Sequence, residues 1–359
     1  MKSRVLFFDY SRKGNILGGL EDLFNGLGLA KVARGSVAVK LHMGELGNTA
    51  YLRPIFAAKI ISLVKNAGGR PFATDTTVNY PGGRGTVAGY LSTAASNGFV
   101  ADSIGAPIVI AGDDENSAIS LAVQNPIRGC QLREVRLASE IYQADNMLVL
   151  SHVKGHALSG FGGALKNLAM GCVTKATKRA QHMVNCPGHD DSRCDLCGDC
   201  VKICPTAALT ISQDQLNRDR DKCNACSDCL FTCPNDAWFW PEGVKEKLQV
   251  EMAHAAAAIH AQFKGRVGYI NFIQDVTPYC DCAAAAGSYL VADVGILAAY
   301  DPVAIDKASL DLIDRARLIT TETRPPDLLG KLHGVNSLVQ LEVAAKLGMG
   351  SLDYELATA

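Results

Sequence analysis

The sequence predicts an α/β protein with a largely parallel sheet, interrupted by a small inserted α+β unit. Short apolar runs alternate with helix-like amphipathic stretches along most of the 359 residues, which is the pattern of strands connected by helices. A cysteine-dense segment then falls between two apolar runs that look like strands of the same sheet. We therefore expect a host domain built from residues 1–185 and 241–359, with residues 186–240 inserted into it.

Seven apolar runs are the expected strands of the host sheet. They cover residues 4–8, 36–41, 71–74, 107–110, 147–150, 267–272 and 295–298. The expected helices cover residues 53–66, 302–318 and 338–347. Gly68 and Gly69 should end the first helix, and Asp301 is a suitable N-cap for the second because its carboxylate can accept from the free amides of the first turn.

The cysteine-dense segment contains two matching runs. Each has four cysteines, with two residues between successive members of the first three, three residues before the fourth, and a proline directly after it. This spacing is typical of two [4Fe-4S] clusters, in which the fourth cysteine of each run ligates the other cluster. One predicted ligand set is Cys194, Cys197, Cys200 and Cys233, and the other is Cys223, Cys226, Cys229 and Cys204.

A pair of zinc sites is the alternative for these cysteines, because Cys-x2-Cys pairs also form zinc ribbons. Eight cysteines in two matching runs, followed by Pro205 and Pro234, fit iron and sulfide better. Residues 186–240 resemble the bacterial-type two-cluster ferredoxins, and they carry nine Asp against five Lys or Arg. Such negative charge disfavours adding an electron to a cluster and can steer a basic redox partner.

The composition narrows the possible partners. A net charge of −1 and 6% aromatic residues provide neither a basic field nor a stacking platform for nucleic acid. No apolar stretch approaches the length of a membrane span, and the apolar run at residues 5–8 is too short for a secretion signal. Cluster-binding cysteines need a reducing compartment. We therefore expect a cytoplasmic protein of an anaerobe, whose partner is a redox protein that donates or accepts electrons.

Polar residues follow five of the expected strands. Ligands of open parallel sheets bind outside the carboxyl ends of the strands, so we expect these residues to meet at one edge and form an active or binding site. The residues at this predicted edge are Lys40, His42, Glu45, Asp75, Thr76, Thr77, Ser151, His152, Lys154, His156, Asp275, Cys280, Cys282 and Asp301.

Two features of this edge indicate an anionic small molecule. Between Lys154 and Asn167, a glycine-rich turn precedes a helix start that bears Lys166, and free amides and the helix dipole favour an anion there. A tight structural turn is the alternative. Arg84, flanked by glycines, is a second anion candidate.

A third metal site is a further hypothesis. Cys280 and Cys282 are separated by one residue, so their thiolates can bind one soft metal or act as a ligand and an acid or nucleophile. They could equally be free buried thiols. Other ligand types are present in His42, His152, His156, His182, Cys186 and Asp75.

Several runs outside the cysteine segment resemble the domain-of-unknown-function family 362. They are KLHMGE at 40–45, GNTAY at 47–51, TDT at 74–76, SHVKGH at 151–156, GFGGALKNL at 160–168 and DPVAID at 301–306. The resemblance implies an α/β host domain, two clusters in an inserted ferredoxin domain, and anaerobic redox work. The chain departs from the family pattern at residues 283–286, where alanines replace polar and glycine-rich residues.

These observations favour an iron-sulfur oxidoreductase that carries single electrons through two [4Fe-4S] clusters to or from a substrate or metal on the host domain. The expected site residues are His42, Asp75, His152, Lys154, His156, Lys166, Cys280 and Cys282. The two lysines would hold an anionic group and a histidine would deliver protons. Two other interpretations remain open: a non-catalytic electron relay that docks a partner redox enzyme, and a metal or cluster delivery protein.

Overall fold

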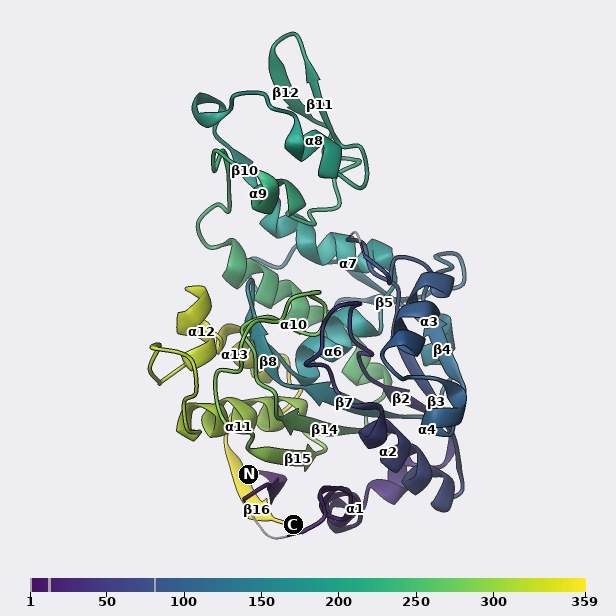
Figure 1. Cartoon of the computed structure of the whole chain (residues 1–359). Helices are drawn as coiled ribbons and strands as arrows, with labels where there is room; N and C mark the ends of the chain where they lie inside the picture. The colour runs from purple at the N-terminus through teal and green to yellow at the C-terminus, as the bar shows by residue number, and fades with distance from the viewer. Residues whose placement is uncertain (1, 12–13, 81) are drawn as a thin grey trace.

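An eight-stranded sheet forms the centre of the molecule (Figure 1). The computed structural model describes residues 2–11, 14–80 and 82–359. The strands follow the order β16-β1-β15-β14-β7-β2-β3-β4, and all are parallel except β15, which is antiparallel to both neighbours. Their bounds are β1 (Ser3–Asp9), β2 (Gly35–Lys40), β3 (Gly69–Thr76), β4 (Ile108–Ala111), β7 (Asn146–His152), β14 (Val267–Ile273), β15 (Gly295–Ala299) and β16 (Tyr354–Thr358).

All seven expected strands are present, and the eight-stranded sheet contains one more that the sequence did not predict. That strand is β16, which pairs in parallel with β1 and closes one end of the sheet. Its residues are exposed or only partly buried, so it lacks the continuous apolar run by which buried parallel strands are recognised. The expected helices are also present, with Asp301 as the N-cap of the second.

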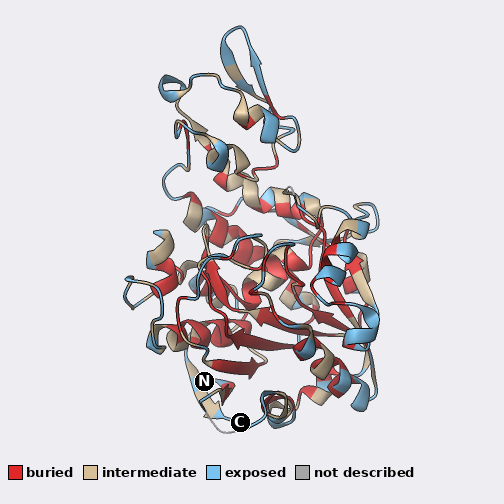
Figure 2. Ribbon diagram, in the orientation of Figure 1, coloured by how far each residue is buried: buried red, intermediate tan, exposed pale blue. Residues whose placement is uncertain are grey.

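Helices cover both faces of the sheet because successive side chains of a strand point to opposite faces. In β7, Met147 and Val149 belong to one buried apolar cluster, whereas Leu148 and Leu150 belong to the other. The strands are buried throughout the centre of Figure 2. On the first face lie α5 (Ser139–Tyr142), α6 (Ala164–Gly171), α10 (Val244–Gln262), α11 (Pro302–Arg315), α12 (Leu328–His333) and α13 (Val339–Lys346); on the second lie α1 (Ile16–Leu27), η1 (Leu29–Val32), α2 (Pro54–Asn66), α3 (Val87–Ser96) and α4 (Ala101–Ile104).

Two small hairpins accompany the main sheet, β5 (Ile119–Ala122) with β6 (Glu134–Leu137) and β8 (Lys154–His156) with β9 (Gly160–Gly162). Helix α7 (Lys175–His182) and the turn η2 (Met183–Asn185) then lead out of the α/β layers. Within the described ranges, no helix combines the length and the apolar character that a membrane crossing needs.

Residues 186–240 lie beyond α7 and α10, away from the main sheet (Figure 1). The strands on either side of this segment in the sequence, β7 and β14, are parallel neighbours in the sheet. The buried apolar cluster of the segment comprises only Cys200, Leu209 and Trp238. Its elements are β10 (Gly188–His189) paired with β13 (Trp238–Phe239), β11 (Leu209–Ser212) paired with β12 (Gln215–Arg218), η3 (Asp191–Arg193), α8 (Asp199–Ile203) and α9 (Asp228–Thr232).

The direction of β15 corrects one prediction. Asp301 was expected at the same edge as the ends of the other strands, but β15 runs antiparallel to β14 and β1, so its carboxyl end lies at the opposite edge. There Asp301 accepts from the amides of Val303 and Ala304, both at 2.9 Å. It also accepts from Ser3 Oγ at 2.5 Å and from the Ser351 amide at 2.8 Å. Its role is structural, because it joins the start of β1, the start of α11 and the C-terminal segment.

Replacing Asp301 by Ala should therefore lower the free energy of unfolding by about 2 kcal/mol, since the variant loses a helix cap and two further hydrogen bonds. Chemical denaturation measures the change. The matched control is Asp22→Ala, at an exposed position of α1, where we expect a loss below about 0.5 kcal/mol. Equal losses in the two variants would contradict this role for Asp301.

Candidate functional site

A cavity of about 400 Å³ lies at the carboxyl ends of β2, β3 and β7, and Lys40, Asp75 and His152 are among its lining residues. After β2, the chain adds β3 and β4 on one side of that strand. It then adds β7 and β14 on the other side. The order of strands thus reverses between β2 and β7. Ligands of open α/β sheets bind in the crevice at such a switch point, so the topology alone favours this cavity as a binding site.

The cavity brings together most of the expected site residues. Seven of the eight line it: His42, Asp75, His152, His156, Lys166, Cys280 and Cys282. Lys154 does not line the cavity. Its side chain is buried, donates to the Ala50 carbonyl and forms an ion pair with Asp281 at 2.7 Å. The structure therefore leaves Lys166, and not Lys154, in a position to meet a ligand.

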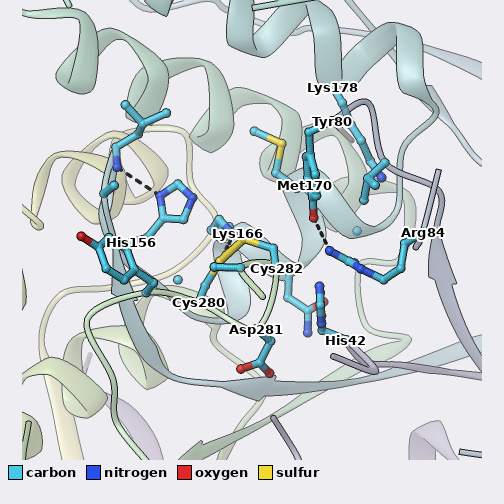
Figure 3. Close-up of a pocket in the computed structure, with 18 of the residues that line it drawn as sticks. His42, Tyr80, Arg84, His156, Lys166, Met170, Lys178, Cys280, Asp281 and Cys282 are labelled. Atoms are coloured by element: carbon cyan, nitrogen blue, oxygen red, sulfur yellow. Dashed lines mark hydrogen bonds between the residues drawn. A yellow bond between two sulfur atoms is a disulfide. The ribbon is translucent and has the colours of Figure 1, made fainter. Parts of the chain in front are cut away.

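A disulfide joins Cys280 and Cys282 in this structure, so these cysteines are not free thiols. Between them, Asp281 points away from the sulfur atoms (Figure 3) and contacts Lys154 and, at 3.1 Å, His152 Nδ1. Burial alone would raise the pKa of Asp281, but the positive charge of Lys154 and contact with His152 outweigh it and hold this pKa well below its usual value. This buried carboxylate fixes the loop so that the disulfide faces the cavity.

Two nitrogen groups lie beside the disulfide (Figure 3). Lys166 Nζ is 3.8 Å from Cys280 Sγ, and burial lowers the pKa of Lys166 to about 8. One ring nitrogen of His156 and the two sulfur atoms all lie within 4.8 Å of one another. Burial, followed by the charge of Lys166, lowers the pKa of His156 well below its usual value, so His156 is neutral at physiological pH.

The other ligand types of the third-metal hypothesis do not join this group. Both ring nitrogens of His152 face acceptors, the Asp281 carboxylate and the Gln274 carbonyl. Cys186 lies elsewhere, with its sulfur 3.8 Å from that of Cys223. His42 lines the cavity, and its Nδ1 accepts from the Gly44 amide at 3.0 Å. Its Nε2 consequently carries the proton, and this buried atom has no hydrogen-bond partner among the described residues.

Two of the four cations that line the cavity are neutralised by carboxylates. Lys40 pairs with Asp75 at 2.9 Å, and Arg84 pairs with Glu45 at 2.9 Å. Asp75 also accepts from the hydroxyl of Tyr90. Arg84 was a candidate to bind an anion, but its charge is already compensated, and it donates as well to the hydroxyl of Tyr80 (Figure 3).

The other two cations, Lys166 and Lys178, have no carboxylate partner among the described residues. Lys178 instead donates to Thr76 Oγ1 at 2.7 Å and to backbone carbonyls of Thr76 and Thr77. Burial lowers the pKa of Lys178 to about 7. The sequence analysis missed this residue because no helix was expected there; its position four residues before His182, which also lines the cavity, was the available signal.

The glycine-rich turn before α6 does not offer a free anion site. The amides of Ala164 and Leu165 donate to the two carboxylate oxygens of Asp306, at 2.7 and 2.9 Å. Burial raises the pKa of Asp306 to about 6. The expectation that an external anion binds at this helix start is therefore wrong, because a carboxylate of the protein itself occupies the position.

Eight of the nine cysteines of residues 186–240, all except Cys186, form two groups, each lining its own small cavity. The first group is Cys194, Cys197, Cys200 and Cys233, and the second is Cys204, Cys223, Cys226 and Cys229. The halves of the segment repeat their hydrogen bonds to sulfur. The Ala208 amide donates to Cys204 Sγ at 3.3 Å, and the Ala237 amide donates to Cys233 Sγ at 3.4 Å.

The second group adjoins the host cavity, since Cys226 lines both its own small cavity and the large one. Arg179 on α7 holds the loop before it, donating to the carbonyls of Arg220, Asp221 and Cys223. The Asn224 side chain also donates to the Asn79 carbonyl at 2.6 Å. These contacts fix the second cysteine group at the wall of the cavity.

Comparison with known proteins gives the family but no activity. No curated protein matches the chain. A crystal structure of a protein from Thermotoga maritima aligns with a TM-score of 0.37 and 10% identity, over 72% of this chain and 49% of the other. The lactate racemase apoprotein from Thermoanaerobacterium thermosaccharolyticum aligns with a TM-score of 0.36 and 8% identity, over 75% of this chain and 50% of the other.

This chain thus covers about half the length of either solved structure. At such low scores neither similarity carries an argument about this protein. The family match is of a different kind, since it extends over residues 37–311, which is most of the sequence. The chain belongs to the DUF362 family, described as a domain of unknown function.

Proposed function

We propose that this protein is an iron-sulfur oxidoreductase that passes single electrons between a redox partner and the host cavity. One observation carries the proposal: Cys226, a predicted cluster ligand, lines the same cavity as His42, Lys166 and the Cys280–Cys282 pair. An inserted ferredoxin-like domain at residues 186–240 would hold two [4Fe-4S] clusters at its cysteine groups. Bound there, the clusters supply single-electron transfer.

The residues of the inserted segment fit such clusters. Each group of four cysteines surrounds its own small cavity and draws its fourth member from the other run. Backbone amides directed at Cys204 and Cys233 are of the kind that stabilise cluster sulfurs. The segment also has few buried apolar residues, and domains of this size depend on metals or other cross-links when their core is small.

The positions of the two cysteine groups indicate the path that electrons would take. The second cysteine group adjoins the cavity, whereas the residues that line the cavity of the first group all lie within residues 189–238. A partner redox protein would therefore exchange electrons at the first group. The location that best suits this chemistry is the cytoplasm of an anaerobe, where thiolates stay reduced.

Within the cavity, Lys166 and Lys178 would bind an anionic small molecule, because their charges lack carboxylate partners among the described side chains. His42 would donate a hydrogen bond or a proton from Nε2, which has no acceptor among the side chains and backbone groups that the structure describes. A non-catalytic relay needs no such charged cavity beside its clusters, which favours the oxidoreductase. A third metal at His156, Cys280 and Cys282 would require these cysteines as thiolates, since thiolates are the metal-binding form.

Metal analysis tests the cluster assignment. Purified without oxygen and reconstituted, the protein should hold about eight irons and eight sulfides per chain, two cubes of four. Cys226→Ala should lose about half of both and the electron paramagnetic resonance signal of one reduced cluster. Cys186→Ser is the matched control, because Cys186 lies beside Cys223 but belongs to neither predicted ligand set, and it should keep all eight. Zinc in place of iron in the reconstituted wild type would overturn the assignment.

Sulfate binding tests the anion site, since the charge of sulfate stays constant between pH 6 and pH 9. Lys178 has a pKa of about 7 and is protonated below it, so the affinity should rise as the pH falls through this value. Calorimetric titration should show affinity at pH 6 at least about tenfold higher than at pH 9.

Lys178→Met should remove the part of this pH dependence that is centred near pH 7 and leave the part centred near pH 8, which belongs to Lys166. Lys175→Met is the control, because Lys175 lies on the same helix but does not line the cavity. A change in affinity centred near pH 7 that persists in Lys178→Met would show that another group is responsible for it.

A further inference from the structure

We propose that the Cys280–Cys282 disulfide is the electron acceptor of the cavity, and that two electrons arriving from the side of Cys226 open it to a dithiol. The inference rests on the electron-transfer function proposed above and identifies the group that receives the electrons. It gives the disulfide a chemical role in place of a structural one.

The disulfide is unsuited to stabilising the fold. Its two cysteines are two positions apart in sequence, and a cross-link that closes so short a loop restricts the unfolded chain very little. None of the remaining eleven cysteines takes part in a disulfide. Oxidation is therefore confined to one pair, which is the pattern of a redox-active disulfide and not of a disulfide scaffold.

The position of the disulfide suits an acceptor. Both cysteines line the cavity that Cys226 also lines, so electrons that have reached the second cysteine group need no further docking event to reach the disulfide. Asp281 is held on the opposite side by Lys154 and His152, and this anchor keeps the sulfur atoms facing the cavity through a change in their bonding. A pair on a free loop would lack this constraint.

The charge beside the disulfide also favours its reduction. Lys166 Nζ lies 3.8 Å from Cys280 Sγ, and a nearby cation stabilises the thiolate that forms when the sulfur–sulfur bond breaks. The negative charge of Asp281 is directed away and compensated by Lys154. Lys166 thus acts as a positioning residue for the charge on Cys280.

The reaction balances with a named external donor. A low-potential one-electron donor of the ferredoxin or flavodoxin class supplies two electrons in succession. The sulfur–sulfur bond takes up both electrons and breaks, leaving a thiolate on Cys280 beside the Lys166 ammonium and a second sulfur on Cys282. A proton from solvent converts Cys282 to its thiol. The donor is oxidised by two equivalents and the protein is reduced by two.

The test follows the disulfide itself. The full-length protein with its iron and sulfide is reduced without oxygen by photoreduced deazaflavin, a one-electron donor, then quenched in acid and alkylated. Peptide mass spectrometry measures alkylation at Cys280 and Cys282. We expect alkylation to rise from near zero to near completion. Alkylation of both residues before any reduction would overturn the inference, because no disulfide would then exist.

Two comparisons separate this inference from the cluster assignment. In Cys226→Ala the donor should open the disulfide more slowly than in the wild type. A water-soluble phosphine should open it in both proteins, which would show that the variant is folded and that its disulfide is formed. Opening by the donor at equal rates in both proteins would show direct attack and overturn the inference. Wild type whose iron is reduced while the disulfide stays closed would overturn it too, but would leave the proposed electron transfer standing. Wild type without iron would remove both.

Lys166 provides a separate check on the positioning role. Lys166→Met should slow donor-driven opening by about tenfold, and Lys166→Arg should restore most of the rate because it retains the cation. The iron content of both variants should equal that of the wild type. Equal opening rates in the two variants would refute a role for the charge.

Discussion

The candidate site depends on one buried carboxylate. Asp281 lies 2.7 Å from Lys154 Nζ and 3.1 Å from His152 Nδ1, and all three side chains are almost fully buried. Taking such charges out of water is costly, and only their close pairing makes the arrangement tolerable. The arrangement joins β7 and β8, which carry His152 and Lys154, to the loop after β14. The position of the disulfide, and therefore the shape of the cavity around it, follows from this pairing.

Charge compensation also divides the cations of the site into two kinds. Lys154, Lys40 and Arg84 each have a carboxylate partner and hold parts of the fold together. Within the described part of the chain, Lys166 and Lys178 form no such pair. Burial, which the charges of Asp281 and Asp75 offset only in part, lowers their pKa values to about 8 and about 7. An anion that entered the cavity would supply the missing charge and would itself raise both pKa values. Ligand binding would then be coupled to proton uptake.

Much of the fold could be predicted from the sequence because buried parallel strands appear as continuous apolar runs. Seven strands were found in this way. The cap at Asp301 was predicted from its side chain, which can accept from the free amides of a helix start. The direction of β15 was not, because an apolar run looks the same in either direction and only pairing decides it. For the same reason, the end of β15 was assigned to the wrong edge of the sheet.

The candidate site was predicted only in part. Strand ends identified the edge and nine of its lining residues, since topology brings carboxyl ends together. Sequence could not distinguish Lys154 from Lys166, because which lysine meets a buried carboxylate depends on packing. It also could not show that Asp306 fills the helix start at Ala164, since these residues are far apart in the chain. The bond between Cys280 and Cys282 depends on oxidation, which a sequence does not record.

The three hydrogen bonds from Arg179 to the loop before the second cysteine group have a kinetic meaning if that group holds a cluster. Separate redox proteins must meet by diffusion, orient and part again for each electron transferred. Here the second cysteine group and the cavity belong to one chain and are held in a fixed relative position. Each is therefore present to the other at a constant effective concentration, and no diffusional encounter between them is needed. Electron delivery to the cavity would then be independent of protein concentration, and only the first exchange with an outside partner would depend on collision.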